Sequence, residues 1–235
     1  MATIAFNLIA TAGLINGLTP KEVSDKYLTP VTPAGYAFSI WSLIYAGLIA
    51  FSVYQFLPAN RAKYRNITTL YILTCLLNCS WVYFWHHEQI VVCFVLIFLL
   101  AISLFFINRN LRIKTTTGEY WLVKAPFSLY FGWVTAATLV SFAISLVYMQ
   151  VKVVTGAAIF LIAIASLLGL IVRFKSLNYL YPLAIAWALT AIAVKQSGNT
   201  AIVVACAAGV VCSLIATLSF VVNLPSQSTS RTTAQ

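Results

Sequence analysis

Long apolar runs, separated by short groups of charged residues, make up most of this chain. From Phe38 to Leu57 no residue is charged, and a run of this length is what a helix needs to cross the hydrocarbon core of a bilayer. Similar runs predict eight helices, at residues 3–18, 38–57, 67–87, 89–107, 120–149, 153–172, 177–195 and 200–223. The pattern therefore predicts an all-α integral membrane protein with about eight transmembrane helices.

The composition supports this class and excludes others. Of the 235 residues, 62% are hydrophobic and only 8% are charged, whereas a soluble domain carries roughly a quarter charged residues. The apolar runs are also too long and too continuous for the alternating strands of an outer-membrane barrel. The formal net charge of +10 does not indicate nucleic-acid binding, because the basic residues stand in small groups at the predicted helix ends instead of forming one patch.

The positions of the basic residues predict the orientation of the chain. With eight helices, one side of the membrane holds both termini and the loops after the second, fourth and sixth helices, and the opposite side holds three of the 4 acidic residues. By the positive-inside rule, both termini are expected on the cytoplasmic side, in a bacterial inner membrane or an organelle membrane. The polar residues 224–235 are expected to form a disordered tail. The basic residues on the terminal side are Arg61, Lys63, Arg65, Arg109, Arg112, Lys114, Lys124, Arg173, Lys175 and Arg231, and those opposite are Lys21, Lys26, Lys152 and Lys195.

Three predicted helices carry aromatic and small polar residues at helical spacing, so that these residues share one face of each helix. They are Trp41 and Tyr45 near the start of 38–57, Asn78, Trp81 and Trp85 in 67–87, and Tyr130, Trp133, Ala137 and Ser141 in 120–149. Such stripes fit helix packing with hydrogen bonds between helices, and they also fit the wall of a pocket for a flat apolar ligand. The loop 19–37, which contains Pro33 and Gly35, precedes the first stripe and would lie above such a pocket.

The remaining polar residues indicate no catalytic or metal site. No Asp or Glu falls inside a predicted span, which argues against a proton-driven pump. His86, His87 and Glu88 could ligate a metal, but adjacent polar residues at a helix end are more typical of an interfacial turn. We therefore expect no metal ligands and no catalytic residues.

Three segments, in order along the chain, resemble the translocator protein/tryptophan-rich sensory protein (TspO/MBR) family. Pro33-Ala-Gly-Tyr-Ala-Phe-Ser-Ile-Trp41-Ser-Leu-Ile-Tyr45 is similar to its Pro-rich loop and Trp-x-x-x-Tyr helix start. Leu77-Asn78-Cys-Ser-Trp81 is similar to its Leu-Asn-Trp-x-Trp segment, and the segment from Leu129 to Ser141 is similar to its fifth-helix motif. Together the three segments identify residues 1–150 as a five-helix bundle of this family.

The resemblance implies a pocket inside that bundle, closed by the loop 19–37. Family members bind porphyrins, haem-related tetrapyrroles and, in animals, sterols. By this resemblance the protein is a membrane receptor, sensor or carrier for a porphyrin-like or sterol-like ligand, with lipid around it and no required cofactor. The implied ligand-binding residues are Pro33, Tyr36, Trp41, Tyr45, Asn78, Trp81, Tyr130, Trp133, Ala137 and Ser141.

Departures from the family pattern leave two alternatives open. Cys79 replaces a tryptophan of the third helix, and Ser141 replaces the usual asparagine of the fifth. The loop 19–37 has no Trp, whereas some members implicated in porphyrin breakdown have one there. A porphyrin-degrading enzyme is therefore less expected than a binding protein. A structural membrane subunit with a lipid-filled pocket is the other alternative.

Residues 151–223 add three predicted helices that have no counterpart in the five-helix family. We expect these helices to pack against the five-helix bundle and to cover the surface that shorter relatives use for dimerisation. The protein is therefore expected to be a monomer, with a homodimer as the alternative. Trp187 lies in this added part and is not expected to affect the pocket.

Overall fold

The computed structural model describes residues 2–111 and 116–222, and within them the chain is helical with no strand. A 3₁₀ turn, Gly35–Ser39, precedes α3, and a π-helical turn, Tyr120–Lys124, joins α7 to α8. The helices are α1 (Ala2–Thr11), α2 (Pro20–Lys26), α3 (Ile40–Phe56), α4 (Pro58–Arg61), α5 (Arg65–His86), α6 (Ile90–Asn110), α7 (Thr117–Glu119), α8 (Ala125–Tyr148), α9 (Thr155–Ser176), α10 (Leu180–Lys195) and α11 (Thr200–Val222).

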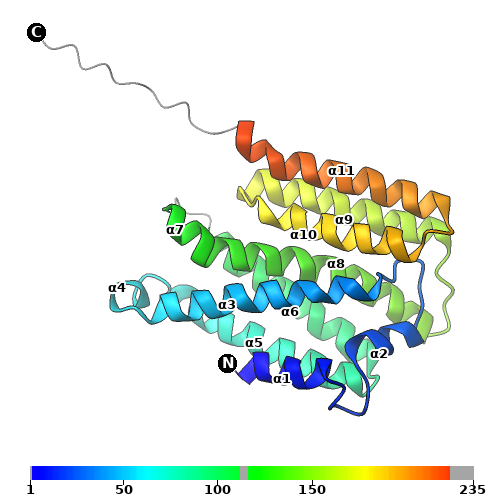
Figure 1. Ribbon diagram of the computed structural model, residues 1–235, viewed down its shortest axis with the longest axis horizontal. Helices are drawn as coiled ribbons and strands as arrows, with labels where there is room; N and C mark the ends of the chain where they lie inside the picture. Colours follow the sequence, from blue (N-terminus) through cyan, green and yellow to red (C-terminus); the bar gives the residue numbers. More distant parts are fainter. Residues whose placement is uncertain (1, 112–115, 223–235) are drawn as a thin grey trace, which may run out of the picture.

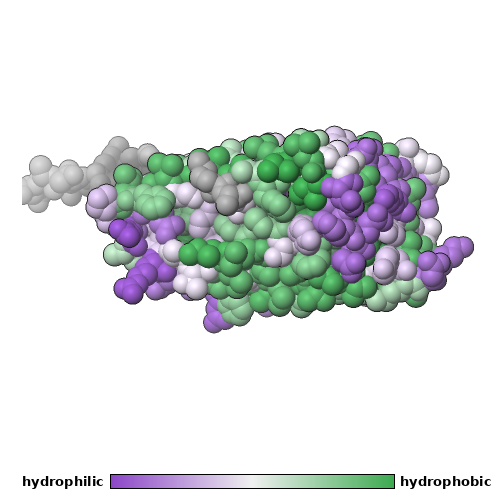
Figure 2. Space-filling model, turned by 90° about the horizontal axis from the view of Figure 1, so that it is seen from below, coloured by the Kyte–Doolittle hydropathy of each residue, from purple (hydrophilic) through white to green (hydrophobic). Residues whose placement is uncertain are grey.

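The predicted all-α membrane class is confirmed. Among the described residues, 6 helical segments are long and apolar enough to cross a membrane, and the shorter helix α10 is also apolar. The long helices run side by side, with α8 between a group formed by α9, α10 and α11 and a group formed by α3, α5 and α6 (Figure 1). On the face that includes α1 and α5, a broad hydrophobic band separates hydrophilic residues at the two ends of the molecule (Figure 2).

The first helix is shorter than the predicted helix 3–18. Helix α1 has 10 residues, which corresponds to about 15 Å of a hydrocarbon core about 30 Å thick. It stops because Gly13, Asn16 and Gly17 have positive φ values of 73°, 54° and 69°, a conformation that bends the chain away from the helix. Helix α1 lies beside the half of α5 that ends at His86 (Figure 1), where Asn7 Nδ2 donates to Asn78 Oδ1 at 2.8 Å.

The predicted loop 19–37 is partly helical. Thr19 and Glu22 form a capping box, and Pro20 stands at the first turn, where its missing N–H is not needed. This local chemistry favours the start of α2, and the buried side chain of Val23 packs it against the rest of the protein. We call residues 19–37 the lid, because they lie over the aromatic residues of α3, α5 and α8.

Polar contacts link α6 both to α8 and to the start of α10. Asn108 of α6 donates from Nδ2 to the carbonyl oxygen of Phe127 in α8 at 3.1 Å. Asn178, just before α10, donates to Asn108 Oδ1 at 2.9 Å. Each buried amide is thereby satisfied, as an apolar interior requires. Of the helices predicted beyond residue 150, α9 and α10 contact α8, and α11 packs against α9 and α10.

Some of the basic residues from which the orientation was predicted are buried. Arg173, at the end of α9, is only 1% exposed. Its Nε donates to the carbonyl oxygen of Ala216 at 2.9 Å, and its guanidinium lies 3.9 Å from the centre of the Tyr179 ring. Arg173 therefore ties α9 to α11. Arg112, Lys114, Arg231 and the predicted tail 224–235 lie outside the described residues.

Substituting Gly132 tests the contact between α8 and α10. A Cβ at Gly132 would collide with the carbonyl oxygen of Tyr181 and would approach Ala184 Cβ to 2.8 Å. Gly132→Ala should lower the unfolding free energy by about 1–3 kcal/mol, the usual effect of overpacking. Gly156→Ala is the matched control, because nothing lies within 4 Å of its added Cβ. Thermal unfolding in one detergent measures both, and equal melting temperatures would show that this contact does not limit stability.

Candidate functional site

Trp41 occupies the centre of an aromatic cluster below the lid. It is the second residue of α3, and one turn later Tyr45 stacks against it with ring centres 5.3 Å apart and planes 19° apart. From α8, Tyr130 and Trp133 meet Trp41 edge-on, at 5.6 Å and 6.3 Å between ring centres. Such edge-on pairs place the positive rim of one ring against the negative face of another, which favours a fixed arrangement.

Helix α5 contributes a second aromatic pair to this cluster. Trp81 and Trp85 are one turn apart, and their rings stack with centres 5.1 Å apart. Trp85 Nε1 donates to the carbonyl oxygen of Pro20 at 3.1 Å, so that α5 holds the start of the lid. The stripes predicted on α3, α5 and α8 therefore converge beneath the lid.

A small apolar pocket lies between these rings and the lid. Its free volume is about 50 Å³, well below the roughly 300–1,000 Å³ of sites that hold a drug-sized ligand. Side chains fill most of the space, so that little room remains in this arrangement. The lining residues are Ser24, Pro33, Phe38, Trp41, Trp81, Trp85, Ile97, Trp133, Ala136, Ala137, Val140, Ser141, Ile144, Ala188 and Ile192.

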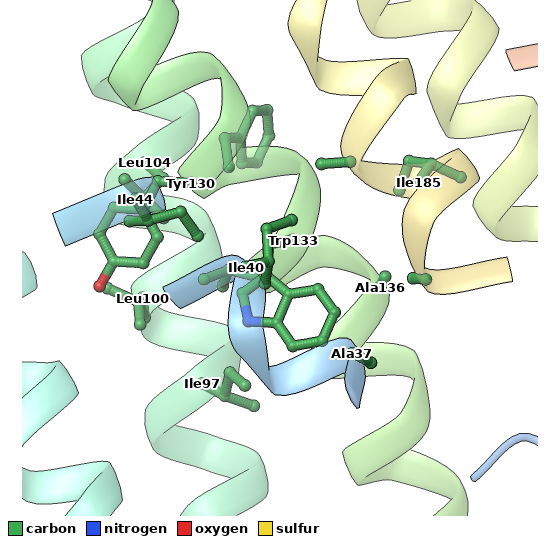
Figure 3. Packing of buried hydrophobic residues seen from close by; sticks show 14 of the residues in the cluster. Ala37, Ile40, Ile44, Ile97, Leu100, Leu104, Tyr130, Trp133, Ala136 and Ile185 are labelled. Carbon is green, nitrogen blue, oxygen red and sulfur yellow. The ribbon is translucent and has the colours of Figure 1, made fainter. Parts of the chain in front are cut away.

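Two indole N–H groups of residues that line this pocket lack a protein partner. Trp81 Nε1 and Trp133 Nε1 are both buried, and neither has an acceptor among the described residues. Figure 3 shows the Trp133 indole among Ile40, Ile97 and Ala136, which supply hydrocarbon and no side-chain acceptor. An unsatisfied buried donor costs about 1–3 kcal/mol, so a bound molecule with an acceptor would recover that free energy.

The structure brings together six of the ten predicted site residues, namely Pro33, Trp41, Trp81, Trp133, Ala137 and Ser141, on the pocket wall. Tyr45 and Tyr130 support Trp41 from below and line a separate cavity. Asn78 does not line the pocket, since its side-chain oxygen accepts from Asn7 and from Tyr45. Tyr36 is 42% exposed and packs on Trp187 outside the pocket.

Sequence reasoning missed the contribution of α10. Ala188 and Ile192 are one turn apart on this helix and form part of the pocket wall. Neither residue differs in type from the apolar residues around it, and the helix falls outside the three segments that resemble the known family. Phe38, by contrast, stands inside the first of those segments and could have been included.

Helix α10 also holds the lid through backbone and indole hydrogen bonds. The Ala34 N–H donates to the carbonyl oxygen of Ala191 at 2.9 Å. Trp187 Nε1 donates to the carbonyl oxygen of Ala37 at 3.0 Å, and the Trp187 ring meets Tyr36 at 5.4 Å. Trp187 therefore contacts the lid, although it lies outside the segments that resemble the known family and does not line the pocket.

Ion pairs hold the charged part of the lid. Asp25 accepts from Lys21 at 2.7 Å and from Lys195 of α10 at 3.1 Å. Lys26 and Tyr27 both donate to Glu88, at 2.6 Å and 2.8 Å, next to the end of α5. The hydrogen bond from Lys21 lowers the pKa of Asp25, and the hydrogen bond from Lys26 lowers the pKa of Glu88. Burial, helped by Glu88, raises the pKa of Tyr27 to about 12.

The chain was compared with protein families, curated proteins and solved structures. The family model described as TSPO-like protein matches residues 1–221. The chain belongs to this TSPO-like family. No curated protein and no solved structure matches it. The match agrees with the resemblance found in the first 150 residues, and it continues through α9, α10 and α11. In this TSPO-like chain the three C-terminal helices are thus part of the matched region and not an extension beyond it.

The described residues of this TSPO-like protein hold no cluster of three or more His, Cys, Asp or Glu side chains that could bind a metal. His86 is buried at the end of α5, where its Nδ1 lies 2.7 Å from the carbonyl oxygen of Val82. His87 is exposed, and Glu88 is occupied by Lys26 and Tyr27. The three adjacent polar residues therefore serve the helix end and the lid.

The lowered pKa values of Asp25 and Glu88 predict how the lid responds to acid. Both carboxylates favour the native state while they are ionised, and this contribution is lost as the pH falls through their lowered pKa values, below 3.8 for Asp25 and 4.5 for Glu88. Hydrogen exchange of the lid amides should therefore show protection that is unchanged from about pH 5 to 8 and weaker below about pH 4. Loss of protection near pH 6 would contradict this assignment. The α5 core amides serve as the internal control.

Proposed function

We propose that this protein binds a flat apolar ligand with hydrogen-bond acceptor groups in the pocket below the lid, and acts as a membrane receptor or carrier for it. The observation that carries this proposal is the pair of unpartnered indole donors, Trp81 Nε1 and Trp133 Nε1, in an otherwise apolar aromatic pocket. Stacking on the indole rings would supply most of the affinity, and the two N–H groups would select the ligand.

The donor pair favours a tetrapyrrole-like ligand over a sterol. A tetrapyrrole with carbonyl or carboxylate groups offers acceptors at separate points of a flat frame, so one molecule can satisfy two donors on different helices. A sterol carries one hydroxyl, which leaves at least one buried donor unpaired at a cost of about 1–3 kcal/mol. Membership of the TSPO-like family agrees with an apolar ligand of either kind.

Binding requires the pocket to open. A free volume of about 50 Å³ does not admit a molecule of this size, so the lid or the aromatic side chains have to move. The contacts of Ala34 and Ala37 with α10 close the lid on one side, and the contact of Trp85 with Pro20 closes it on the other. With the basic turn at Arg61 and Arg65 on the cytoplasmic side, the lid faces the opposite side of the membrane.

Replacing the indole donors tests the proposed ligand chemistry. Trp81→Phe and Trp133→Phe keep an aromatic ring but remove the N–H group. Each should weaken the binding of a dicarboxylic porphyrin roughly fivefold to tenfold, the effect of one hydrogen bond of about 1 kcal/mol, and should change cholesterol binding less. Saturable quenching of tryptophan fluorescence gives the dissociation constants.

Trp121→Phe is the matched control, because Trp121 is 60% exposed and does not line the pocket. An equal loss in all three variants would indicate nonspecific partitioning into the detergent. The absence of saturable quenching in the unmodified protein would reject the proposal and favour a structural subunit with a lipid-filled pocket.

Trp187→Phe tests the closure of the lid. This variant keeps a ring against Tyr36 but removes the hydrogen bond to Ala37. Both association and dissociation of the porphyrin should become faster, by roughly threefold to tenfold for a hydrogen bond of about 1 kcal/mol, with a smaller change in equilibrium affinity. Stopped-flow quenching measures the rates, with Trp121→Phe again as the control. Unchanged rates would mean that the ligand enters elsewhere.

A further inference from the structure

A second and larger cavity lies between α3 and α5, on the opposite side of the Trp41 cluster from the lid. Its free volume is about 370 Å³, several times that of the pocket below the lid. Tyr45 and Tyr130 close its inner end, and Ile49, Val53 and Phe56 form its outer edge. The other lining residues are Thr3, Ile4, Leu48, Ser52, Tyr71, Thr74 and Cys75.

Helix α1 borders only one part of this cavity. Helix α1 begins at Ala2 beside the middle of α5 and continues toward His86, with Thr3 and Ile4 at the edge of the cavity. The first two turns of α5 therefore have no part of α1 beside them (Figure 1). The surface between α3 and α5 is left open where the bilayer would surround it, and Val53 is 64% exposed there. We call this surface the α3–α5 groove.

Hydrocarbon fits the α3–α5 groove because its polar groups already have partners. Ser52 Oγ donates to the carbonyl oxygen of Leu48 at 2.8 Å and lies 2.9 Å from the Tyr71 hydroxyl. Thr74 Oγ1 donates to the carbonyl oxygen of Tyr71 at 2.7 Å. Among the described residues, no buried side-chain polar atom of the groove lacks a partner. The groove therefore differs from the pocket below the lid, where the indole N–H groups of Trp81 and Trp133 have no hydrogen-bond acceptor.

Two basic residues without a salt bridge follow the groove along the chain. Phe56 of the groove ends α3, Arg61 and Lys63 lie in the connection to α5, and Arg65 is the first residue of α5. Lys63 is paired with Glu119. Arg61 and Arg65 are both exposed, and neither has a salt bridge within the described residues. Two guanidinium groups at the membrane surface match the negative charge of a phosphate.

From these observations we infer that the α3–α5 groove binds an anionic phospholipid, with an acyl chain between α3 and α5 and the phosphate at Arg61 and Arg65. The chain lies along Val53 and Phe56 and ends at the rings of Tyr45 and Tyr130. The bound lipid fills the cavity between α3 and α5. This site is separate from the pocket below the lid and does not depend on the ligand proposed there.

The headgroup contact is tested by lipid binding to the full-length protein in detergent, measured by native mass spectrometry. The probes are phosphatidylglycerol and phosphatidylcholine with identical acyl chains. We expect roughly tenfold tighter binding of phosphatidylglycerol, and we expect Arg61→Gln/Arg65→Gln to abolish this preference. Arg109→Gln/Lys175→Gln is the matched control, because it removes the same charge from exposed residues that do not line the groove.

The chain contact is tested by filling the groove. Val53→Trp places a large side chain in the groove and should weaken binding of both lipids by at least fivefold. Val95→Trp is the matched control on α6, where Val95 is 49% exposed and does not line the groove. Glycerol phosphate, which has the headgroup but no chain, should not displace the lipid at millimolar concentration.

Several results would overturn this inference. One is equal binding of the two lipids by the unmodified protein, and another is an equal loss of preference in the two double variants. Unchanged binding by Val53→Trp would show that the chain lies elsewhere. If Arg61→Gln/Arg65→Gln does not fold, the preference of the unmodified protein for phosphatidylglycerol is measured at increasing salt concentration instead. This preference should disappear toward 1 M salt, because charges are then screened beyond about 3 Å. A preference that persists there rejects the contact with the arginines.

Discussion

The close approach of α8 and α10 at Gly132 is the contact on which the rest of the structure depends. The absence of a side chain at Gly132 lets the backbone of α8 lie against the carbonyl oxygen of Tyr181. Small residues allow helices to pack closely in a membrane, where the hydrophobic effect does not drive helices together. From this contact α10 reaches both the pocket wall, through Ala188 and Ile192, and the lid, through Trp187 and Ala191. The candidate site is thus shared between the N-terminal and C-terminal parts of the chain.

The two cavities differ in the hydrogen bonds that they leave unmade. The pocket below the lid is small and closed, but Trp81 and Trp133 keep unpaired donors in it. The α3–α5 groove is larger, and its hydroxyl groups are paired with the helix backbone or with each other. A protein interior retains an unpaired polar group only at a free-energy cost. We therefore interpret the first cavity as a site of selective recognition and the second as a surface for hydrocarbon.

The lid is held in a way that suits controlled opening. Its hydrogen bonds with α10 and α5 are few, and its ion pairs at Asp25 and Glu88 are partly exposed, so each contributes little on its own. The lid contacts two different helices, so a ligand that enters has to break only some of these hydrogen bonds and ion pairs. A closed pocket with a weakly held cover is consistent with a protein that exchanges its ligand with the membrane or the adjoining solution.

The sequence by itself determined the membrane class, most helix boundaries and the convergence of three aromatic stripes. These features depend on local properties, namely the length of apolar runs and the spacing of Trp and Tyr along a helix. The positive-φ residues Gly13, Asn16 and Gly17 also carried a local signal for the end of α1, but the apolar pattern up to residue 18 concealed it. The tertiary structure alone decided that Ala188 and Ile192 line the pocket, that Arg173 is buried and that Asn78 binds Asn7. In a soluble helix, the apolar face shows which side is buried. In a membrane helix, lipid and protein interior are equally apolar, so residue type does not show which side of α10 faces the protein.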